Sequence, residues 1–180
     1  MSESGITENL ASTDQPRPVE DLERTEHSLL SSIGLLILRV GIGGFMASHG
    51  WGKFQMVMAG DLDKFGDPIG IGSAASLLLI VSAEFVCALL VVIGAATRIA
   101  AIFPVIGMAV AAFIVHGGDP WTMGEGARLF FSGASESWAS KEAPLLFLIP
   151  FLALVFTGAG RFSVDALVRS RWQSRRQQAG

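Results

Sequence analysis

The chain has 180 residues, of which 51% are hydrophobic and 16% are charged, and its formal net charge at pH 7 is −3. A soluble domain of this size carries about 25% charged residues, so the composition argues against an ordinary soluble protein. We therefore expect a small integral membrane protein whose main partner is the lipid bilayer and which binds no nucleic acid.

The first 28 residues form a polar segment. It contains seven carboxylates but only Arg17 and Arg24 as fixed positive charges, together with Pro16 and Pro18. A secretory signal would need a basic start followed by an apolar stretch, and this segment has neither. We predict that residues 1–28 form a disordered acidic tail.

Four apolar stretches follow this tail. They run from Leu29 to Ser48, from Ala74 to Gly94, from Ile99 to Val115 and from Ala143 to Ala159. A helix needs about 20 residues to cross the hydrocarbon layer, with a range of about 17 to 25. Helices of a soluble bundle would show a polar face, and strands of a membrane barrel would alternate apolar with polar residues. The pattern predicts an all-α fold, an integral membrane bundle of four helices.

The distribution of positive charge predicts the orientation of these spans. Two Lys and Arg residues precede the first stretch, Arg98 lies in the middle turn and five follow the last stretch, against four in the other two loops. By the positive-inside rule, both termini are expected in the cytoplasm. Residues 169–180 form a basic C-terminal tail, which we expect to lie as an amphipathic helix on the anionic cytoplasmic leaflet.

Two ionisable residues interrupt the apolar stretches. Arg39 and Glu84 each lie ten residues beyond the start of a predicted span. Because these two helices run antiparallel, both side chains are expected near the midplane, where a pair would offset part of the cost of burying each charge. Two interpretations stay open: the pair fixes the helix register, or it forms the polar centre of a ligand cavity.

A second polar set is predicted near the outer face. No short ligand spacing such as His-x-x-x-His occurs, so we predict no metal site. Such groups can cap helix ends and contact interfacial water, or exchange protons with a bound redox ligand, since imidazole changes protonation near neutral pH. The set comprises His49, Lys53, His116, Asp119, Lys141 and Glu142.

Cysteine content excludes one kind of redox chemistry. Cys87 is the only cysteine, so the chain has neither an intramolecular disulfide nor a Cys-x-x-Cys relay. The sequence also lacks a phosphate-binding glycine-rich loop and a haem attachment motif. Electrons for a redox reaction would therefore come from a substrate or a partner protein.

Several short motifs, taken in order, resemble the DoxX family over about residues 30 to 168. The first span opens with Leu38-Arg39-Val40-Gly41 and is followed by His49-Gly50-Trp51-Gly52-Lys53-Phe54. Later matches are Glu84, Gly94-Ala95-Ala96-Thr97-Arg98, His116 and Gly158-Ala159-Gly160-Arg161-Phe162-Ser163-Val164-Asp165. The resemblance implies a DoxX-like four-span domain over residues 29–168 in a bacterial inner membrane. It also implies kinship with the membrane subunit of a thiosulfate:quinone oxidoreductase, after which the family is named.

The leading hypothesis is a membrane subunit of an oxidoreductase that binds a quinone as its cofactor among the helices. In this hypothesis Arg39, Lys53 and Glu84 bind the quinone, while His49, His116 and Glu84 act as catalytic residues that pass protons. A redox partner protein is then expected.

Two alternatives remain open. A non-enzymatic scaffold or accessory protein would use the same charges to hold its fold and the outer loop from Gly117 to Lys141 to recruit a partner. A small transporter is also compatible with charge at the midplane, although four spans without an internal repeat argue against it. A homo-oligomer would supply the second half of such a transporter.

Overall fold

The computed structural model describes residues 19–178, and every regular element in this range is a helix. The all-α class predicted from the sequence is confirmed. Two of the elements, η1 and η2, are π-helical segments that continue the α-helices before them. The elements in chain order are α1 (Val19–Ala59), α2 (Ser73–Val81), η1 (Ser82–Cys87), α3 (Ala88–Ile93), α4 (Thr97–Val110), η2 (Ala111–Val115), α5 (Met123–Phe131), α6 (Glu142–Thr157) and α7 (Val164–Gln178).

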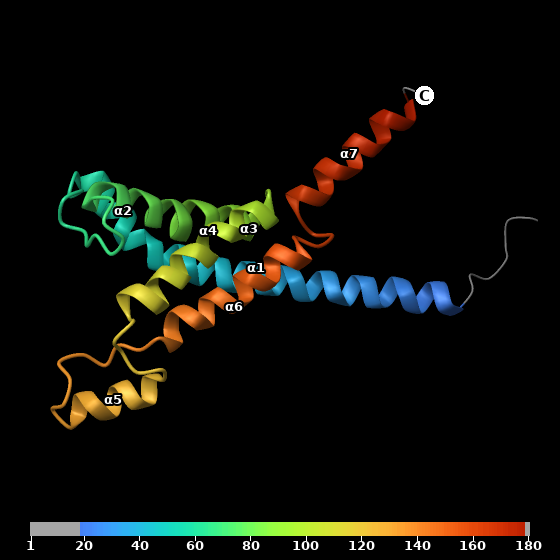
Figure 1. Ribbon diagram of the computed structural model, residues 1–180. Helices are drawn as coiled ribbons and strands as arrows, with labels where there is room; N and C mark the ends of the chain where they lie inside the picture. Colours follow the sequence, from blue (N-terminus) through green and yellow to red (C-terminus); the bar gives the residue numbers. More distant parts are fainter. Residues whose placement is uncertain (1–18, 179–180) are drawn as a thin grey trace, which may run out of the picture.

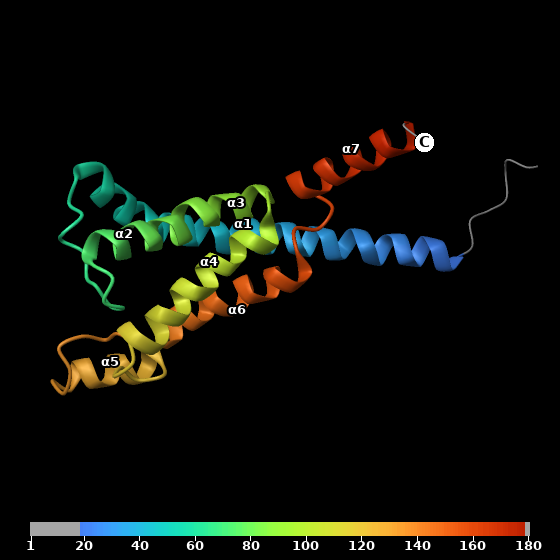
Figure 2. The same cartoon turned by 45° about the horizontal axis from the view of Figure 1, so that its top comes forward.

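Three helical rods in the described part are long and apolar enough to cross a bilayer, namely Ser28–Ala59, Ser73–Ile93 and Thr97–Val115. The fourth predicted span corresponds to α6, a shorter apolar helix of 16 residues. At 1.5 Å per residue α6 is about 24 Å long, somewhat less than the hydrocarbon layer of about 30 Å. It packs against α4 within the bundle (Figures 1 and 2). The predicted membrane bundle is therefore confirmed, with one short member.

The first helix is longer at both ends than the sequence predicted. It begins at Val19, so residues 19–28 continue the helix instead of belonging to a disordered tail. The helix also runs past Ser48 to Ala59, because the segment after Ser48 contains no proline and a helix tolerates the two glycines in it. Residues 1–18, the rest of the predicted tail, lie outside the described residues, and of the predicted C-terminal tail all but 179–180 belongs to α7.

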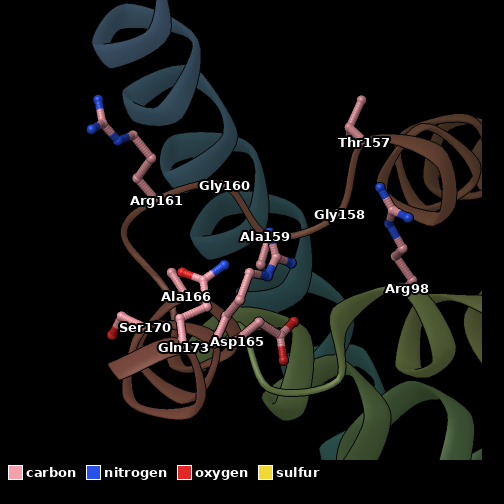
Figure 3. Close-up of a pocket in the computed structure, with 11 residues that line it drawn as sticks. Arg98, Thr157, Gly158, Ala159, Gly160, Arg161, Asp165, Ala166, Ser170 and Gln173 are labelled. Atoms are coloured by element: carbon pink, nitrogen blue, oxygen red, sulfur yellow. The ribbon is translucent and has the colours of Figure 1, made fainter. Parts of the chain in front are cut away.

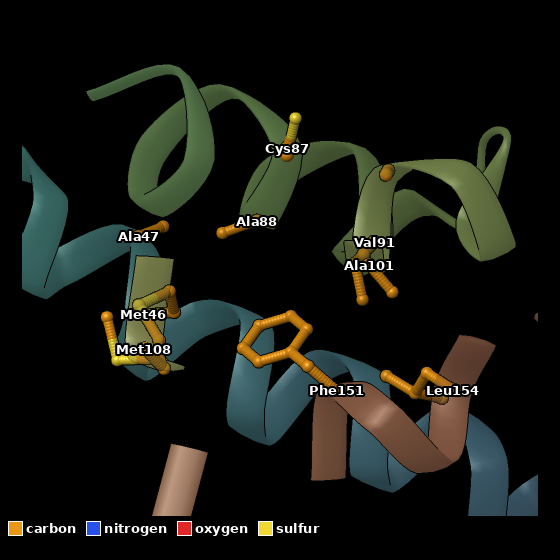
Figure 4. Close-up of a cluster of buried hydrophobic side chains, with 10 residues drawn as sticks. Met46, Ala47, Cys87, Ala88, Val91, Ala101, Met108, Phe151 and Leu154 are labelled. Carbon is orange, nitrogen blue, oxygen red and sulfur yellow. The ribbon is translucent and has the colours of Figure 1, made fainter. Parts of the chain in front are cut away.

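The core of the bundle lies where the three rods and α6 meet. Met46 of α1, Val91 of α3, Ala101 of α4 and Phe151 of α6 are fully buried (Figure 4). Many core positions are alanines, which allow helix backbones to approach closely where lipid supplies no hydrophobic drive between helices. Large apolar residues cover the outside of the rods instead, as expected for surfaces that contact lipid.

The helix α1 approaches the backbone of the second rod closely at Gly50. A β-carbon at this position would lie 2.8 Å from the backbone carbonyl carbon of Glu84. A β-carbon at Gly52, by contrast, would meet nothing within 4 Å. Gly50 therefore sets how closely Lys53, one turn further along α1, approaches the segment that carries Glu84.

We predict that Gly50→Ala destabilises the bundle by about 1–3 kcal/mol, because the added methyl group overpacks the contact with η1. Gly52→Ala is the matched control, and it should be neutral or slightly stabilising since alanine favours the helix by about 1 kcal/mol. Unfolding in detergent, followed by helical circular dichroism, measures both. Equal stability of Gly50→Ala and the wild type would contradict the close packing of α1 on η1.

Candidate functional site

A cavity of about 620 Å³ is lined by α1, the connection from α1 to α2, the second and third rods and the start of α6. Its lining includes four of the five site residues predicted from the sequence: His49, Lys53, Glu84 and His116. Arg39, the fifth, is not among them. Most of the remaining wall is apolar, with Phe65, Pro68, Ile69, Leu79, Ile80, Phe103, Ile106, Val110, Val115 and Phe147 among the lining residues.

Lys53 and Glu84 form an ion pair at this cavity. The Lys53 Nζ lies 2.5 Å from Glu84 Oε2, and the Glu84 side chain is only 3% exposed. Glu84 lies in η1, and such π-helical turns are frequent at functional sites because the extra residue redirects side chains. Phe85 of η1 stacks on Phe54 of α1, with ring centroids 4.8 Å apart, and so holds the two helices together beside the ion pair.

His116 lines the cavity directly after η2. Its Nδ1 is 2.8 Å from Asp119 Oδ2, and both side chains are about one-third exposed. Lys141 donates from Nζ to the backbone carbonyl of Asp119 at 2.7 Å, which ties this turn to the start of α6. The sequence placed Asp119 in the outer polar set without a specific role, whereas the structure makes it the partner of His116.

Arg39 is fully buried at the other end of the bundle. Its guanidinium donates to the backbone carbonyls of Val91 in α3 and Phe162 in the turn before α7. Val91 lies seven residues beyond Glu84, or about 10 Å along the helix. The expected pairing of Arg39 with Glu84 is therefore not formed, because α1 runs past the predicted end at Ser48 to Ala59, and its later residues Gly50 and Lys53 lie against Glu84 instead.

The same end of the bundle is closed by Asp165, the second residue of α7. Its carboxylate accepts hydrogen bonds from the backbone N–H groups of Ala96 (2.7 Å) and Thr97 (3.0 Å), and its own N–H donates to the carbonyl of Gly94. These contacts cap the start of α4, whose first N–H groups lack partners within the helix. Arg39 and Asp165 thus connect α1, α3, α4 and α7, which is a structural role.

The connection between α1 and α2 forms one wall of the cavity and is ordered by Asp67. This carboxylate accepts from the N–H of Gly72 at 2.7 Å, from the Ser76 hydroxyl at 2.9 Å and from the N–H of Ile71 at 3.0 Å. These bonds, first of all the one from Gly72, lower the pKa of Asp67 below its ordinary value. Asp67 therefore fixes the start of α2 next to Pro68 and Ile69, which line the cavity.

Within residues 19–178, no group of three or more His, Cys, Asp or Glu side chains is arranged to hold a metal ion. The apolar wall of the cavity gave no signal in the sequence, since its residues look like any other lipid-facing positions. Only the residues at the polar end of the cavity could be recognised from the sequence, because charged and imidazole side chains are rare in membrane spans.

Fold and cavity together define a helical integral membrane protein with an apolar, ligand-sized cavity that contains a partly buried ion pair. The DoxX family model matches residues 34–117, a range that includes His49, Lys53, Glu84 and His116. An uncharacterized protein of Haemophilus influenzae is 33% identical over 134 residues, which is 73% of this chain and 87% of that relative. No solved structure matches the chain. The chain belongs to the DoxX family.

We predict that acidification loosens the start of α2. A carboxylate with a lowered pKa in the folded state stabilises the fold fully above its ordinary pKa of about 3.9, and this contribution disappears as the pH falls through the lower folded value. Amide protection factors at Ile71 and Gly72, measured by hydrogen exchange, should therefore fall below about pH 4.

The control for this experiment is Asp63→Ala, which removes an exposed carboxylate from the same connection and should keep the wild-type pH profile. Asp67→Ala should show weak protection at every pH. Protection of Ile71 and Gly72 that does not change with pH in the wild type would contradict this role of Asp67.

Proposed function

We propose that the chain is the quinone-binding membrane subunit of a quinone-linked oxidoreductase. The observation that carries this proposal is the cavity itself, which joins a long apolar wall to a polar end with a partly buried Lys53–Glu84 pair. A molecule that fits such a cavity has an apolar body and a small polar head. A membrane quinone has both features.

The cavity volume supports a ligand of this size. Small-molecule pockets usually measure about 300–1,000 Å³, and the cavity of about 620 Å³ lies within this range. The Lys53 ammonium group has three N–H donors and uses one of them toward Glu84, so two remain for a carbonyl oxygen. His49 and His116 lie on the same lining.

In this proposal each polar residue of the cavity has a different role. A bound quinone would supply an acceptor for two electrons and two protons. Lys53 would bind and polarise a carbonyl oxygen, while Glu84 holds the ammonium group in place and can accept or release a proton. The His116–Asp119 pair is partly exposed and would exchange protons between the cavity and water. The electrons would come from a substrate or from a redox partner protein.

Location and orientation form part of the same proposal. The chain would lie in the bacterial inner membrane with both termini in the cytoplasm, as the positive-inside rule predicts. In the structure, α7 and the first turns of α1 leave the bundle at one end, and α5 lies at the opposite end (Figure 1). The proton-exchanging residues would then face the outer side.

A second candidate function is a membrane accessory protein that recruits a partner. It is supported by the exposed aromatic residues in and around α5, where Phe131 is 77% exposed and Trp121 and Trp138 are each 61% exposed. Under this alternative the Lys53–Glu84 pair would only stabilise the fold. The two functions differ in whether the cavity holds a quinone.

We predict that a quinone co-purifies with the protein at close to one per chain. Lys53→Gln should lower this amount at least tenfold, because the ligand loses its charged donor and Glu84 loses its partner. Mass spectrometry of the organic extract of the purified protein measures the ratio.

Lys64→Gln is the matched control. Lys64 is an exposed lysine in the connection from α1 to α2. It pairs with Asp61 and does not line the cavity. This variant should retain the quinone. Absence of quinone from the wild type, together with a partner that co-purifies, would overturn the proposal and favour the accessory function.

A further inference from the structure

A second cavity, of about 350 Å³, lies at the end of the bundle opposite to the proposed quinone site. Its lining comes from the start of α4, the segment from Thr157 at the end of α6 to Arg161, and the first ten residues of α7 (Figure 3). The Arg98 side chain packs beside Gly158, where an added β-carbon would lie 3.0 Å from Arg98 Nε. Neither the proposed oxidoreductase chemistry nor the family assignment gives this cavity a role.

The charges around the second cavity are strongly unbalanced. Three arginines line it, Arg98, Arg161 and Arg169, and all three are exposed. Within residues 19–178, none of the three forms an ion pair with a carboxylate. Asp165 also lines the cavity, but both of its oxygens accept hydrogen bonds from the start of α4. Arg161 donates from Nη1 to the Ser28 hydroxyl of α1 at 3.3 Å, whereas the side chains of Arg98 and Arg169 make no hydrogen bond within the described residues. The cavity therefore presents excess positive charge, with the guanidinium donors of Arg98 and Arg169 available to a ligand.

The depth of the cavity in the membrane limits its occupant. Arg98 is the second residue of α4, and Thr157 is the last residue of α6, so the cavity lies where two apolar helices reach the edge of the hydrocarbon layer. The lining residues of α7 share one side of that helix, and the exposed Leu167 and Val168 lie on its other side. The apolar helices α4 and α6 extend from the level of the cavity into the hydrocarbon layer, which suits a molecule that has acyl chains below an anionic head.

We propose that this cavity binds the phosphate group of an anionic phospholipid. Guanidinium groups bind phosphate oxygens through two parallel hydrogen bonds, and basic pockets between membrane helices are known to bind lipid head groups. The Ser170 hydroxyl and the Gln173 amide also line the cavity and provide donors and acceptors for the rest of the head group. Bound lipid would join α7 to the ends of α4 and α6.

The test compares lipids and two variants on the same helix. Arg169→Gln removes a cavity arginine, whereas Arg171→Gln makes the same change in charge two residues further along α7, outside the cavity. No residue of α7 is buried, so neither substitution disturbs packing. The full chain in detergent is titrated with phosphatidylglycerol, phosphatidylcholine or inorganic phosphate, and bound lipid is counted by native mass spectrometry.

Phosphatidylglycerol should bind the wild type and Arg171→Gln at one copy per chain, and Arg169→Gln should weaken this binding at least tenfold. Arg98→Gln should weaken it similarly. Phosphatidylcholine should not bind. Equal weakening in Arg169→Gln and Arg171→Gln would mean diffuse attraction and overturn the proposed site. Inorganic phosphate that competes at the same concentration as the lipid would show that the site takes free phosphate and not a phospholipid.

Discussion

A charge inside a membrane bundle requires a partner, and this constraint determines how the helices of this protein are arranged. Removing a carboxylate or an ammonium group from water costs several kcal/mol, which only close and well-oriented partners offset. Lys53 and Glu84 meet this requirement as a direct ion pair, and Arg39 meets it only in part, through two backbone carbonyls, since its Nε has no partner among the described residues. Each solution fixes which helices touch and at what level.

The two solutions lie at different ends of the bundle and have different consequences. Along α1, Arg39 and Lys53 are 14 residues apart, which corresponds to about 21 Å. Arg39 binds backbone groups that belong to the fold, and its Nε is buried without a hydrogen-bond partner among the described residues. Lys53 pairs with Glu84 beside a large apolar cavity. Its ammonium group has three N–H donors and uses one of them for Glu84, so two remain for a ligand. A charge within the bundle thus joins helix ends at one end of the molecule and borders a ligand-sized cavity at the other.

Apolar length predicted the second and third spans to within two residues, since bilayer thickness controls where such helices end. It could not predict that α1 runs on to Ala59, because the added turns are only partly apolar. The residues of the cavity's polar end were recognisable since charged and imidazole groups are rare in spans. The partner of Glu84 could not be predicted from the sequence. Counting depth from Leu29 placed Arg39 at the level of Glu84, whereas in the structure the close approach at Gly50 brings Glu84 to Lys53.

A double-mutant cycle tests most directly whether the two buried centres are separate. Unfolding free energies in detergent are measured for Lys53→Met, Glu84→Met, Arg39→Met and the two double variants that contain Glu84→Met. Lys53 and Glu84 should show a coupling energy between about 0.5 and 3 kcal/mol, whereas Arg39 and Glu84 should be additive to within about 0.5 kcal/mol. Strong coupling between Arg39 and Glu84, with none between Lys53 and Glu84, would contradict this account.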